Sequence, residues 1–441
     1  MGSIINVALP VMRADLSTDA AGAQWIVNAY LLPLGALVLV GGALGDHYGR
    51  KRLFLIGLAT FTLATLGAAL SPTLLPLLAA RALQGVGAAL LAPNSLAIIA
   101  DAFSGEARAK AVGTWAAAGA IAEAAAPVLG GWIIDVAGWR WAFGIVVPPA
   151  LIGAVVAWRS IGESTADGAE AAPLDLSGAA LISLALAALV WALISFPDRG
   201  MGDPAVLAAF IGGAVLSLAF LTVEARKGDA AMLPLGVFGS RSFSGISLLT
   251  LFLYGALGGL LVLLPWVLIE RFGYSAKQAG AAILPFPLLM GILSRSAGPM
   301  ALKIGIRRTL TFGPLLVAAG FALFALTTRE AAGYWTGIFP ALVTIALGMA
   351  ASVAPLTTAV MNSVEDRYVG VASGVNNAIS RTAGLIATAF LGFVLAGSAD
   401  GGADLLPGFR AAAGFGAALA AGGALLAFLM IREDAVRDGA A

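Results

Sequence analysis

The sequence predicts an all-α integral membrane protein. Hydrophobic residues make up 60% of the 441 residues and charged residues only 11%, and the mean hydropathy is +0.95. A soluble protein of this composition would carry more apolar surface than it is able to bury. The apolar residues also gather in runs of about 20, the length that a helix needs to cross a bilayer.

Charge and residue usage exclude several functions. The formal net charge of +1 gives no basic excess for a nucleic acid partner. The sequence has no cysteine and a single histidine, His47, so neither thiol chemistry nor a zinc-protease motif is expected. It also has no GxxxxGK[ST] loop for the phosphates of ATP. We therefore expect no metal, no cofactor and no enzymatic activity.

Thirteen apolar runs are long enough to span a bilayer. They lie near residues 22–42, 53–70, 73–100, 111–134, 140–158, 176–196, 204–223, 243–268, 277–299, 309–327, 334–356, 368–397 and 408–431. The run from Met1 to Met12 reaches only about 18 Å, against a hydrocarbon core of about 30 Å. We expect it to belong to a truncated first helix, which brings the intended number to fourteen.

The distribution of Lys and Arg predicts the orientation, because cytoplasmic loops carry the excess of basic residues. If the loop after the run 22–42 is cytoplasmic, fifteen of the 25 basic residues fall in inner loops and seven in outer loops. The tail that ends at Ala441 is therefore predicted to be cytoplasmic. Three basic residues are left within predicted spans: Arg81, Arg295 and Arg381.

The loop at residues 42–52 has a second copy at residues 298–308. Each copy has two glycines seven residues apart, followed by a basic cluster, and each joins two predicted spans. This repeat predicts two bundles of about six helices. Bundles related in this way, with a site near the bilayer midplane between them, are typical of secondary transporters.

Seven strings, in the right order along the chain, resemble the motifs of one family. They are the loop 42–52, Arg81-Ala-Leu-Gln84-Gly85, Ala126-Pro127-Val-Leu-Gly130-Gly131, Asn6-Val-Ala-Leu-Pro10, Gln24-Trp25-Ile-Val-Asn28-Ala-Tyr30, Trp139-Arg140-Trp141-Ala-Phe143 and Ser373-Gly-Val-Asn376-Asn377. The chain thus resembles the major facilitator superfamily, and within it the fourteen-helix drug/proton antiporter branch. The family usually has an acid where this chain has Met1 and an Arg where it has His47.

The resemblance implies a proton-coupled secondary active transporter that exports small organic compounds or drugs by alternating access. It implies a first bundle at residues 1–160, a linker with two extra helices at 161–241 and a second bundle at 242–441. A monomer in the bacterial cytoplasmic membrane is expected, with a small organic substrate, protons and the lipid bilayer as partners. Two alternatives stay open: a uniporter or importer of a small metabolite on the same fold, and an embedded enzyme or sensor.

Glu123 is the first candidate for proton coupling or substrate binding. It lies in the middle of an otherwise uncharged run from Ala111 to Ile134. A carboxylate at that depth costs about 2.5–3.5 kcal/mol on insertion scales and is a functional-site hypothesis by default. The alternative is a protonated Glu that is only hydrogen-bonded inside the helix bundle.

Two arginines within the spans are further candidates for proton coupling or substrate binding. Arg81 lies too deep for easy snorkelling, so it is expected to meet acceptors such as Gln84, Asn6 or backbone carbonyls, and a structural anchor is the alternative. Arg381 lies at a depth similar to that of Glu123. Its segment also holds two polar candidates, Asn376 and Asn377. Arg381 is expected to pair with an acid or to line the cavity.

The loop 42–52 is the candidate inner gate. Gly42 and Gly49 permit close approach of the chain, and Asp46 is able to accept hydrogen bonds at a helix N-terminus. With the resemblance, Asp46 is interpreted as a latch that holds the inner gate in one conformation, against the start of the span 368–397. The basic residues of this loop are expected to face lipid headgroups: Arg50, Lys51 and Arg52.

The helix that carries Glu123 also holds a proline and two glycines. Pro127 removes a backbone hydrogen bond and is expected to bend this helix. Gly130 and Gly131 permit close packing against a facing helix.

Overall fold

The computed structural model describes residues 2–103, 105–165, 175–228, 231–328, 333–364, 369–390 and 405–432. The regular structure of these residues is helical. The first elements are α1 (Gly2–Asp15), α2 (Ala20–Tyr48), α3 (Arg50–Ala69), α4 (Leu74–Ala102), α5 (Gly105–Ala137), α6 (Trp139–Gly144), α7 (Val147–Ser160), α8 (Leu176–Arg199) and α9 (Pro204–Lys227). They are followed by η2 (Leu235–Gly239), α10 (Arg241–Glu270), α11 (Ala276–Ile283), α12 (Pro285–Ile304), α13 (Ile306–Thr327), η3 (Tyr334–Ile338), α14 (Phe339–Met361), α15 (Val369–Ala389) and α17 (Leu406–Met430).

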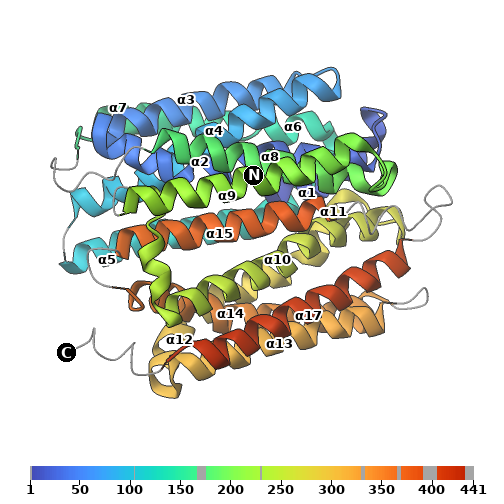
Figure 1. Ribbon diagram of the computed structural model, residues 1–441. Helices are drawn as coiled ribbons and strands as arrows, with labels where there is room; N and C mark the ends of the chain where they lie inside the picture. The colour runs from blue at the N-terminus through green and yellow to red at the C-terminus, as the bar shows by residue number, and fades with distance from the viewer. Residues whose placement is uncertain are drawn as a thin grey trace.

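The helices run side by side along one common direction (Figure 1). We call α1–α7 the N-terminal group and α10–α17 the C-terminal group, and Figure 1 shows most of the first above most of the second. Helices α8 and α9 pack against each other, and α8 also contacts α2 and α15. The two groups meet where α5 contacts α11, where α2 contacts α15 and where α1 contacts α10.

The predicted membrane class is confirmed. In the described residues, eleven helical stretches are long and apolar enough to cross a membrane. Helices α5 and α15, with 33 and 21 residues, fall on the predicted spans 111–134 and 368–397. Residues 391–397 of the second span lie outside the described residues. Helix α1 has only 14 residues, as the short first run predicts.

Two predicted spans are interrupted rather than continuous. The span 140–158 consists of α6 and α7, and the span 277–299 consists of α11 and the first part of α12. A proline stands in the first turn of both second pieces, at Pro148 of α7 and Pro285 of α12. Proline lacks an N–H group and suits the first turn of a helix, so it favours a new start at these points.

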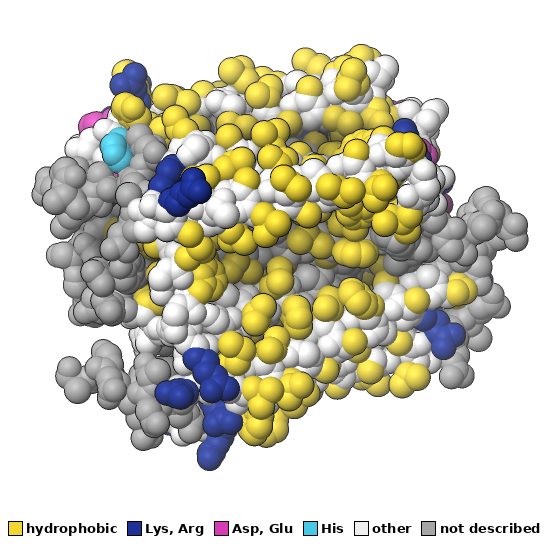
Figure 2. Space-filling model, viewed as in Figure 1, with side chains coloured by type: hydrophobic (Ala, Val, Ile, Leu, Met, Phe, Trp, Pro, Cys, Tyr) yellow, Lys and Arg dark blue, Asp and Glu magenta, His cyan; other side chains and the backbone are white. Residues whose placement is uncertain are grey.

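The molecular surface has the pattern of a protein surrounded by lipid. Figure 2 shows hydrophobic side chains over most of the visible face, with Lys and Arg near its two ends. Large apolar side chains are exposed there and elsewhere, for example Leu63 at 69% and Phe312 at 68%. So extensive an exposed apolar surface is expected only where lipid covers it.

The internal repeat is visible in the backbone. Gly49 precedes α3 with φ 106° and ψ 122°, and Gly305 precedes α13 with φ 103° and ψ 133°. Residues with a Cβ atom rarely adopt this conformation, so both positions favour glycine. The two loops thus share one backbone geometry, although the position of Asp46 in the first is occupied by Leu302 in the second.

The start of α8 and the end of α9 are joined by charged groups, of which the two carboxylates are buried. Lys227 Nζ lies 2.5 Å from Asp175 Oδ1, and only 1% of the Asp175 side chain is exposed. Burial raises the pKa of Asp175, but the Lys227 ammonium group and the Gly178 N–H hold it below its usual range overall. The buried Glu224 carboxylate accepts a hydrogen bond from the backbone of Leu233. These contacts fix the start of the connection from α9 to α10.

We expect Gly49→Ala and Gly305→Ala each to lower the free energy of unfolding by about 1–3 kcal/mol, because alanine is strained at a φ near +105°. Gly259→Ala is the control, since no heavy atom lies within 4 Å of a Cβ built at this helical position. Unfolding in detergent, followed by circular dichroism, measures all three. If Gly305→Ala had the same free energy of unfolding as Gly259→Ala, the second loop would not require the positive φ that it shares with the first loop.

Candidate functional site

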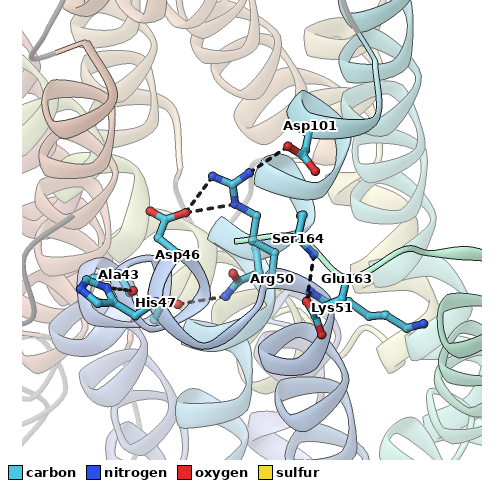
Figure 3. Close-up of polar contacts among 10 residues, drawn as sticks. Ala43, Asp46, His47, Arg50, Lys51, Asp101, Glu163 and Ser164 are labelled. Atoms are coloured by element: carbon cyan, nitrogen blue, oxygen red, sulfur yellow. Dashed lines mark hydrogen bonds and ion pairs between the residues drawn. The ribbon is translucent and has the colours of Figure 1, made fainter. Parts of the chain in front are cut away.

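The candidate inner gate contains a network of two ion pairs within the N-terminal group. Asp46 lies in the last turn of α2 and Arg50 begins α3. Arg50 Nη2 lies 2.9 Å from Asp46 Oδ1, and Arg50 Nη1 lies 3.3 Å from Asp101 Oδ1 on α4 (Figure 3). The ion-pair network therefore connects α2, α3 and α4. Gly42 packs on Pro93 of α4 in the same region.

Two expectations for this loop are corrected. Arg50 does not face the lipid headgroups, because its guanidinium is held between two carboxylates and its side chain is only 17% exposed. Asp46 does not cap a helix N-terminus, since it lies at the end of α2 and accepts from the side chain of Arg50. Lys51 Nζ donates to the carbonyl of Trp158 at 2.8 Å.

The N-terminus of α3 is capped by Glu163, which sequence reasoning missed. Its carboxylate accepts from the backbone N–H groups of Lys51 at 3.0 Å and Arg52 at 3.1 Å. A Cβ at Gly49 would lie only 2.7 Å from this carboxyl group. A carboxylate is favoured at this position because the helix dipole is positive there. The signal in the sequence was that Glu163 is acidic although its loop is predicted to be cytoplasmic, where basic residues are expected.

The expected contact between Asp46 and the start of the span 368–397 is not described. Residues 365–368 lie outside the described residues, and so do the side chains of residues 369 and 370. The role of Asp46 as a latch against that segment stays a prediction.

Arg81 is a buried cation surrounded by neutral groups. Its residue is 1% exposed, its Nε donates to the carbonyl of Ile26 at 2.9 Å, and its Nη1 donates to Gln84 Oε1 at 2.8 Å. The guanidinium carbon lies 4.5 Å from the centroid of the Tyr30 ring. The expected contacts with Gln84 and with a backbone carbonyl are confirmed.

Asn6 is not a partner of Arg81, so that expectation is wrong. The Asn6 Nδ2 group donates to the carbonyl of Leu261 on α10 at 3.1 Å. Helix α1 lies against α10. The Asn6 amide therefore faces the C-terminal group rather than α4. Asn6 therefore joins the two groups of helices.

Gln84 continues the polar contacts of Arg81 into α3. Its Nε2 donates to Thr65 Oγ1 at 2.7 Å, and Thr65 Oγ1 donates to the carbonyl of Phe61 at 2.6 Å. The next residue, Gly85, packs directly on α2, since a Cβ there would lie 2.3 Å from the carbonyl oxygen of Tyr30. The fourth-helix motif thus places its glycine at a helix contact and its polar side chains inside the N-terminal group.

Helix α15 presents a polar stripe beside α2 and α10. Ser373, Asn377 and Arg381 are exposed at intervals of four residues, which places them on one face of the helix. Asn376 instead accepts from the Thr250 hydroxyl of α10 at 2.6 Å. Among the described ion pairs, none involves Arg381. The expected pairing of Arg381 with an acid is thus not seen in the described residues, in which Arg381 is an exposed residue.

The side chains of two charged residues in predicted spans lie outside the described residues: Glu123 of α5 and Arg295 of α12. The role of Glu123 in proton coupling or substrate binding therefore stays a prediction.

The C-terminal half of α5 and helix α11 are in backbone contact. A Cβ at Gly131 would lie 2.3 Å from the carbonyl oxygen of Ala276, and one at Gly280 would lie 2.1 Å from that of Pro127. Gly130 packs on Ile4 of α1. The predicted close packing of the double glycine against a facing helix is confirmed. Helix α5 continues through Pro127 as a single element.

Asp135 caps α11 across the two groups, and sequence reasoning missed it too. Its carboxylate accepts from the backbone N–H groups of Ala276 at 3.1 Å and Lys277 at 2.9 Å. Ser275 and Gln278 complete a capping box at the same helix end. Asp135 follows Gly131 by four residues and so lies on the same face of α5. That spacing was the signal in the sequence.

The described residues contain no group of three or more His, Cys, Asp or Glu side chains arranged to hold a metal ion. What the arrangement offers is a set of helix contacts between two groups, a buried cation and an exposed polar stripe.

Curated proteins similar to this chain include several that are named for drug resistance, antibiotic resistance or antibiotic export. It is 31% identical to the multidrug resistance protein Stp of Mycobacterium tuberculosis over 89% of this chain and 72% of that protein. It is 34% identical to the puromycin resistance protein pur8 of Streptomyces alboniger, over 90% and 79% of the two chains. It is 32% identical to the cephamycin export protein CmcT of Amycolatopsis lactamdurans, over 88% and 80%.

Solved structures share the fold at low sequence identity. The inward-open xylose transporter XylE from E. coli matches with a TM-score of 0.65 at 14% identity, over 98% of this chain and 92% of that one. A peptide transporter of the POT family matches with a TM-score of 0.68 at 15% identity, over 97% and 90%.

The family model described as Major Facilitator Superfamily matches residues 1–388 and 246–440. These ranges include the repeated loops, the Arg81 cluster and the crossing of α5 and α11. The chain is a multi-pass membrane transporter for small substrates and belongs to the Major Facilitator Superfamily.

Proposed function

We infer that this transporter is a proton-coupled exporter of small organic compounds that works by alternating access. Relatives with at least 30% identity are named for multidrug resistance, antibiotic resistance or antibiotic export. We place it in the bacterial cytoplasmic membrane as a monomer with a cytoplasmic C-terminus. The moving units are residues 1–160 and 242–441, and residues 161–241 are the insertion between them.

One observation carries this proposal: at the predicted outer end the described side-chain contacts join the two groups, and the described side-chain contacts of Asp46 and Arg50 do not. At the outer end, Asp135 of α5 binds the N-terminus of α11, and Arg13 of α1 lies 5.6 Å from the ring centroid of Trp266 on α10. At the inner end, the described side-chain contacts of Asp46 and Arg50 stay within the N-terminal group. These contacts support a conformation that is closed at the outer side.

The polar stripe of α15 supports our assignment of where the substrate binds. An arginine in the middle of a spanning helix is costly in lipid. Arg381 is exposed beside α2, where its Cβ lies 3.6 Å from a Cβ built at Gly35. We assign Arg381 and Asn377 to contact with the transported compound between the two units.

Glu123 is the proton carrier in this proposal, and Asp46 with Arg50 forms the inner latch. Glu123 lies on the same helix as Gly131 and Asp135, which make the outer contacts. A change in the charge of Glu123 therefore acts on the element that closes the outer side. Proton uptake and outer opening are coupled through α5.

We expect Glu123→Gln to abolish export driven by a pH gradient and to retain substrate exchange without a gradient. The amide keeps the shape of the side chain but has no proton to exchange. Both activities are measured in proteoliposomes with a panel of substrates and an imposed pH gradient. Undiminished gradient-driven export by this variant would reduce Glu123 to a packing residue, and uptake in the same direction as the protons would favour an importer.

We expect Asp135→Ala to open the outer side more often, because it removes two hydrogen bonds between a carboxylate and a helix N-terminus. The readout is labelling, by a membrane-impermeant thiol reagent, of one cysteine placed at the buried Ala276. A loss of about 1.4 kcal/mol corresponds to a tenfold rise in the open population.

The control for this experiment is Asp203→Ala. Asp203 also caps a helix at the outer end, with its carboxylate 2.7 Å from the Ala205 N–H. Its ion pair is with Arg199 of α8, so the described contacts of its side chain involve neither the N-terminal nor the C-terminal group. Equal labelling in the parent, Asp135→Ala and Asp203→Ala would rule out the outer contact as a gate.

A further inference from the structure

Two buried carboxyl groups meet where α8 begins and α9 ends. Asp175 immediately precedes α8, and Glu224 lies in the last turn of α9. The exposed fraction is 2% for Asp175 and 0% for Glu224. Both lie outside the predicted spans 176–196 and 204–223, at an end that the basic residues predict to be cytoplasmic. The proposed transport mechanism uses neither of them.

Asp175 is the ionised member of the pair, because donors surround it. Its Oδ1 accepts from Lys227 Nζ at 2.5 Å, from Ser177 Oγ at 2.9 Å and from the Gly178 N–H at 2.6 Å. An ammonium group and a helix N-terminus both favour a negative charge at this place. Among the described ion pairs, Lys227 belongs to Asp175 alone.

Glu224 has a donor for only one of its two oxygens. Oε2 accepts from the Leu233 N–H at 2.5 Å, whereas Oε1 is buried and meets no donor in the described residues. Oε1 lies beside Asp175 Oδ2, because a Cβ added at Gly178 would clash with both atoms, and the two carboxyl groups are within hydrogen-bond reach of each other. Two ionised carboxyl groups repel each other there, and a buried charge without a donor is costly. A proton on Oε1 removes both costs, since the neutral group donates a hydrogen bond to Asp175.

We propose that Glu224 is a proton-binding site that fastens the connection from α9 to α10. With its proton on Oε1, the Glu224 carboxyl group bridges Asp175 and the Leu233 N–H, so that the start of α8, the end of α9 and residues 231–233 form one unit. When this proton leaves to water, two carboxylates share one ammonium group in a buried place, and the connection loosens. We call Asp175, Glu224 and Lys227 the carboxyl clamp.

The carboxyl clamp goes beyond the proposed function. The connection that it fastens leads into α10, the first long helix of the C-terminal group. Protonation therefore sets how firmly the helix pair α8 and α9 is held to that group. Neither the transported compound nor a pH gradient takes part in this step.

Few charged groups act on the carboxyl clamp. In the described residues, those that act on Glu224 are Asp175 and Lys227. Helices α2 and α15 pack against α8, but none of their titratable groups has a described hydrogen bond or ion pair with the clamp. The Lys227 side chain is 34% exposed, so water reaches the edge of the clamp and can supply or remove the proton.

The direction of the pH effect follows from where the proton is held. A buried carboxyl group that donates to a neighbour keeps its proton better than the same group in water. The closed clamp therefore binds one proton more than the open clamp. Its opening should rise by up to about tenfold for each pH unit, and level off where the closed clamp also loses the proton.

Hydrogen–deuterium exchange of the Met232 and Leu233 N–H groups measures this opening, because they bind the clamp carboxyl groups. The full-length protein in detergent is followed from about pH 5 upward, and each rate is divided by that of the unprotected chain at the same pH. For the parent we expect the rise and the levelling off. In Glu224→Gln the amide donates to Asp175 in place of the proton, so the opening should not change with pH.

Asp203→Asn is the matched control. It makes the same kind of change, from carboxyl to amide, at the other end of α9, where Asp203 accepts from the Ala205 N–H. We expect it to keep the pH dependence of the parent. If Glu224→Gln does not insert, Lys227→Gln replaces it. Loss of the ammonium group favours the protonated form of the clamp, so the levelling off should move to higher pH.

Four results would overturn the proposal. They are an opening in the parent that does not depend on pH, an undiminished pH dependence in Glu224→Gln, its loss in Asp203→Asn, and an unshifted profile in Lys227→Gln. Protection restored by Na⁺ or K⁺ at constant alkaline pH would also contradict it, because the site would then bind a metal cation rather than a proton. All of these outcomes are separate from failure of the proposed function, in which the parent shows no export driven by a pH gradient.

Discussion

The crossing of α5 and α11 is the contact on which the remaining organisation depends. The two helices touch through their backbones, because Gly131 and Gly280 lack the Cβ atoms that would lie 2.3 and 2.1 Å from carbonyl oxygens. At one end of this crossing the Asp135 carboxylate binds the N-terminus of α11. The close approach is specified by shape and the end contact by charge, so this end of the two groups is held by an interaction that is strong and localised.

Polar groups within the helices follow two different arrangements. In the N-terminal group the charge of Arg81 is enclosed and fully engaged by Ile26, Gln84 and Tyr30. On α15 Arg381 is an exposed residue and no described ion pair involves it. A fixed cation and an exposed cation are suited to different tasks. The first joins α4 to α2 through the carbonyl of Ile26, and in the proposed mechanism the second meets the transported compound.

The sequence predicted features that a single segment determines, and it did not predict features that need a partner from elsewhere in the chain. Apolar runs predicted the spans, and the repeated glycine spacing, which predicted two bundles, marks the two loops in which Gly49 and Gly305 share one backbone geometry. The i,i+3 spacing of Arg81 and Gln84 predicted their contact. The caps made by Glu163 and Asp135 were not predicted, because each carboxylate binds the start of a helix that is distant in the sequence. Glu163 binds Arg52, 111 residues away, and Asp135 binds Ala276 of the other group, 141 residues away. Asn6 was assigned to the wrong partner, since its position on α1 does not show which helix it faces.

The most direct test measures distances at both ends of the helices at once. The chain has no cysteine, so pairs of spin labels are readily placed. One pair sits at the exposed Val136 of α5 and at Lys277 of α11, and the other at the exposed Tyr48 of α2 and Met300 of α12. The account predicts a short outer distance with a long inner distance in one state, and the reverse when protons are supplied from outside. A transporter that remains active while both distance distributions stay unchanged between these conditions would contradict it.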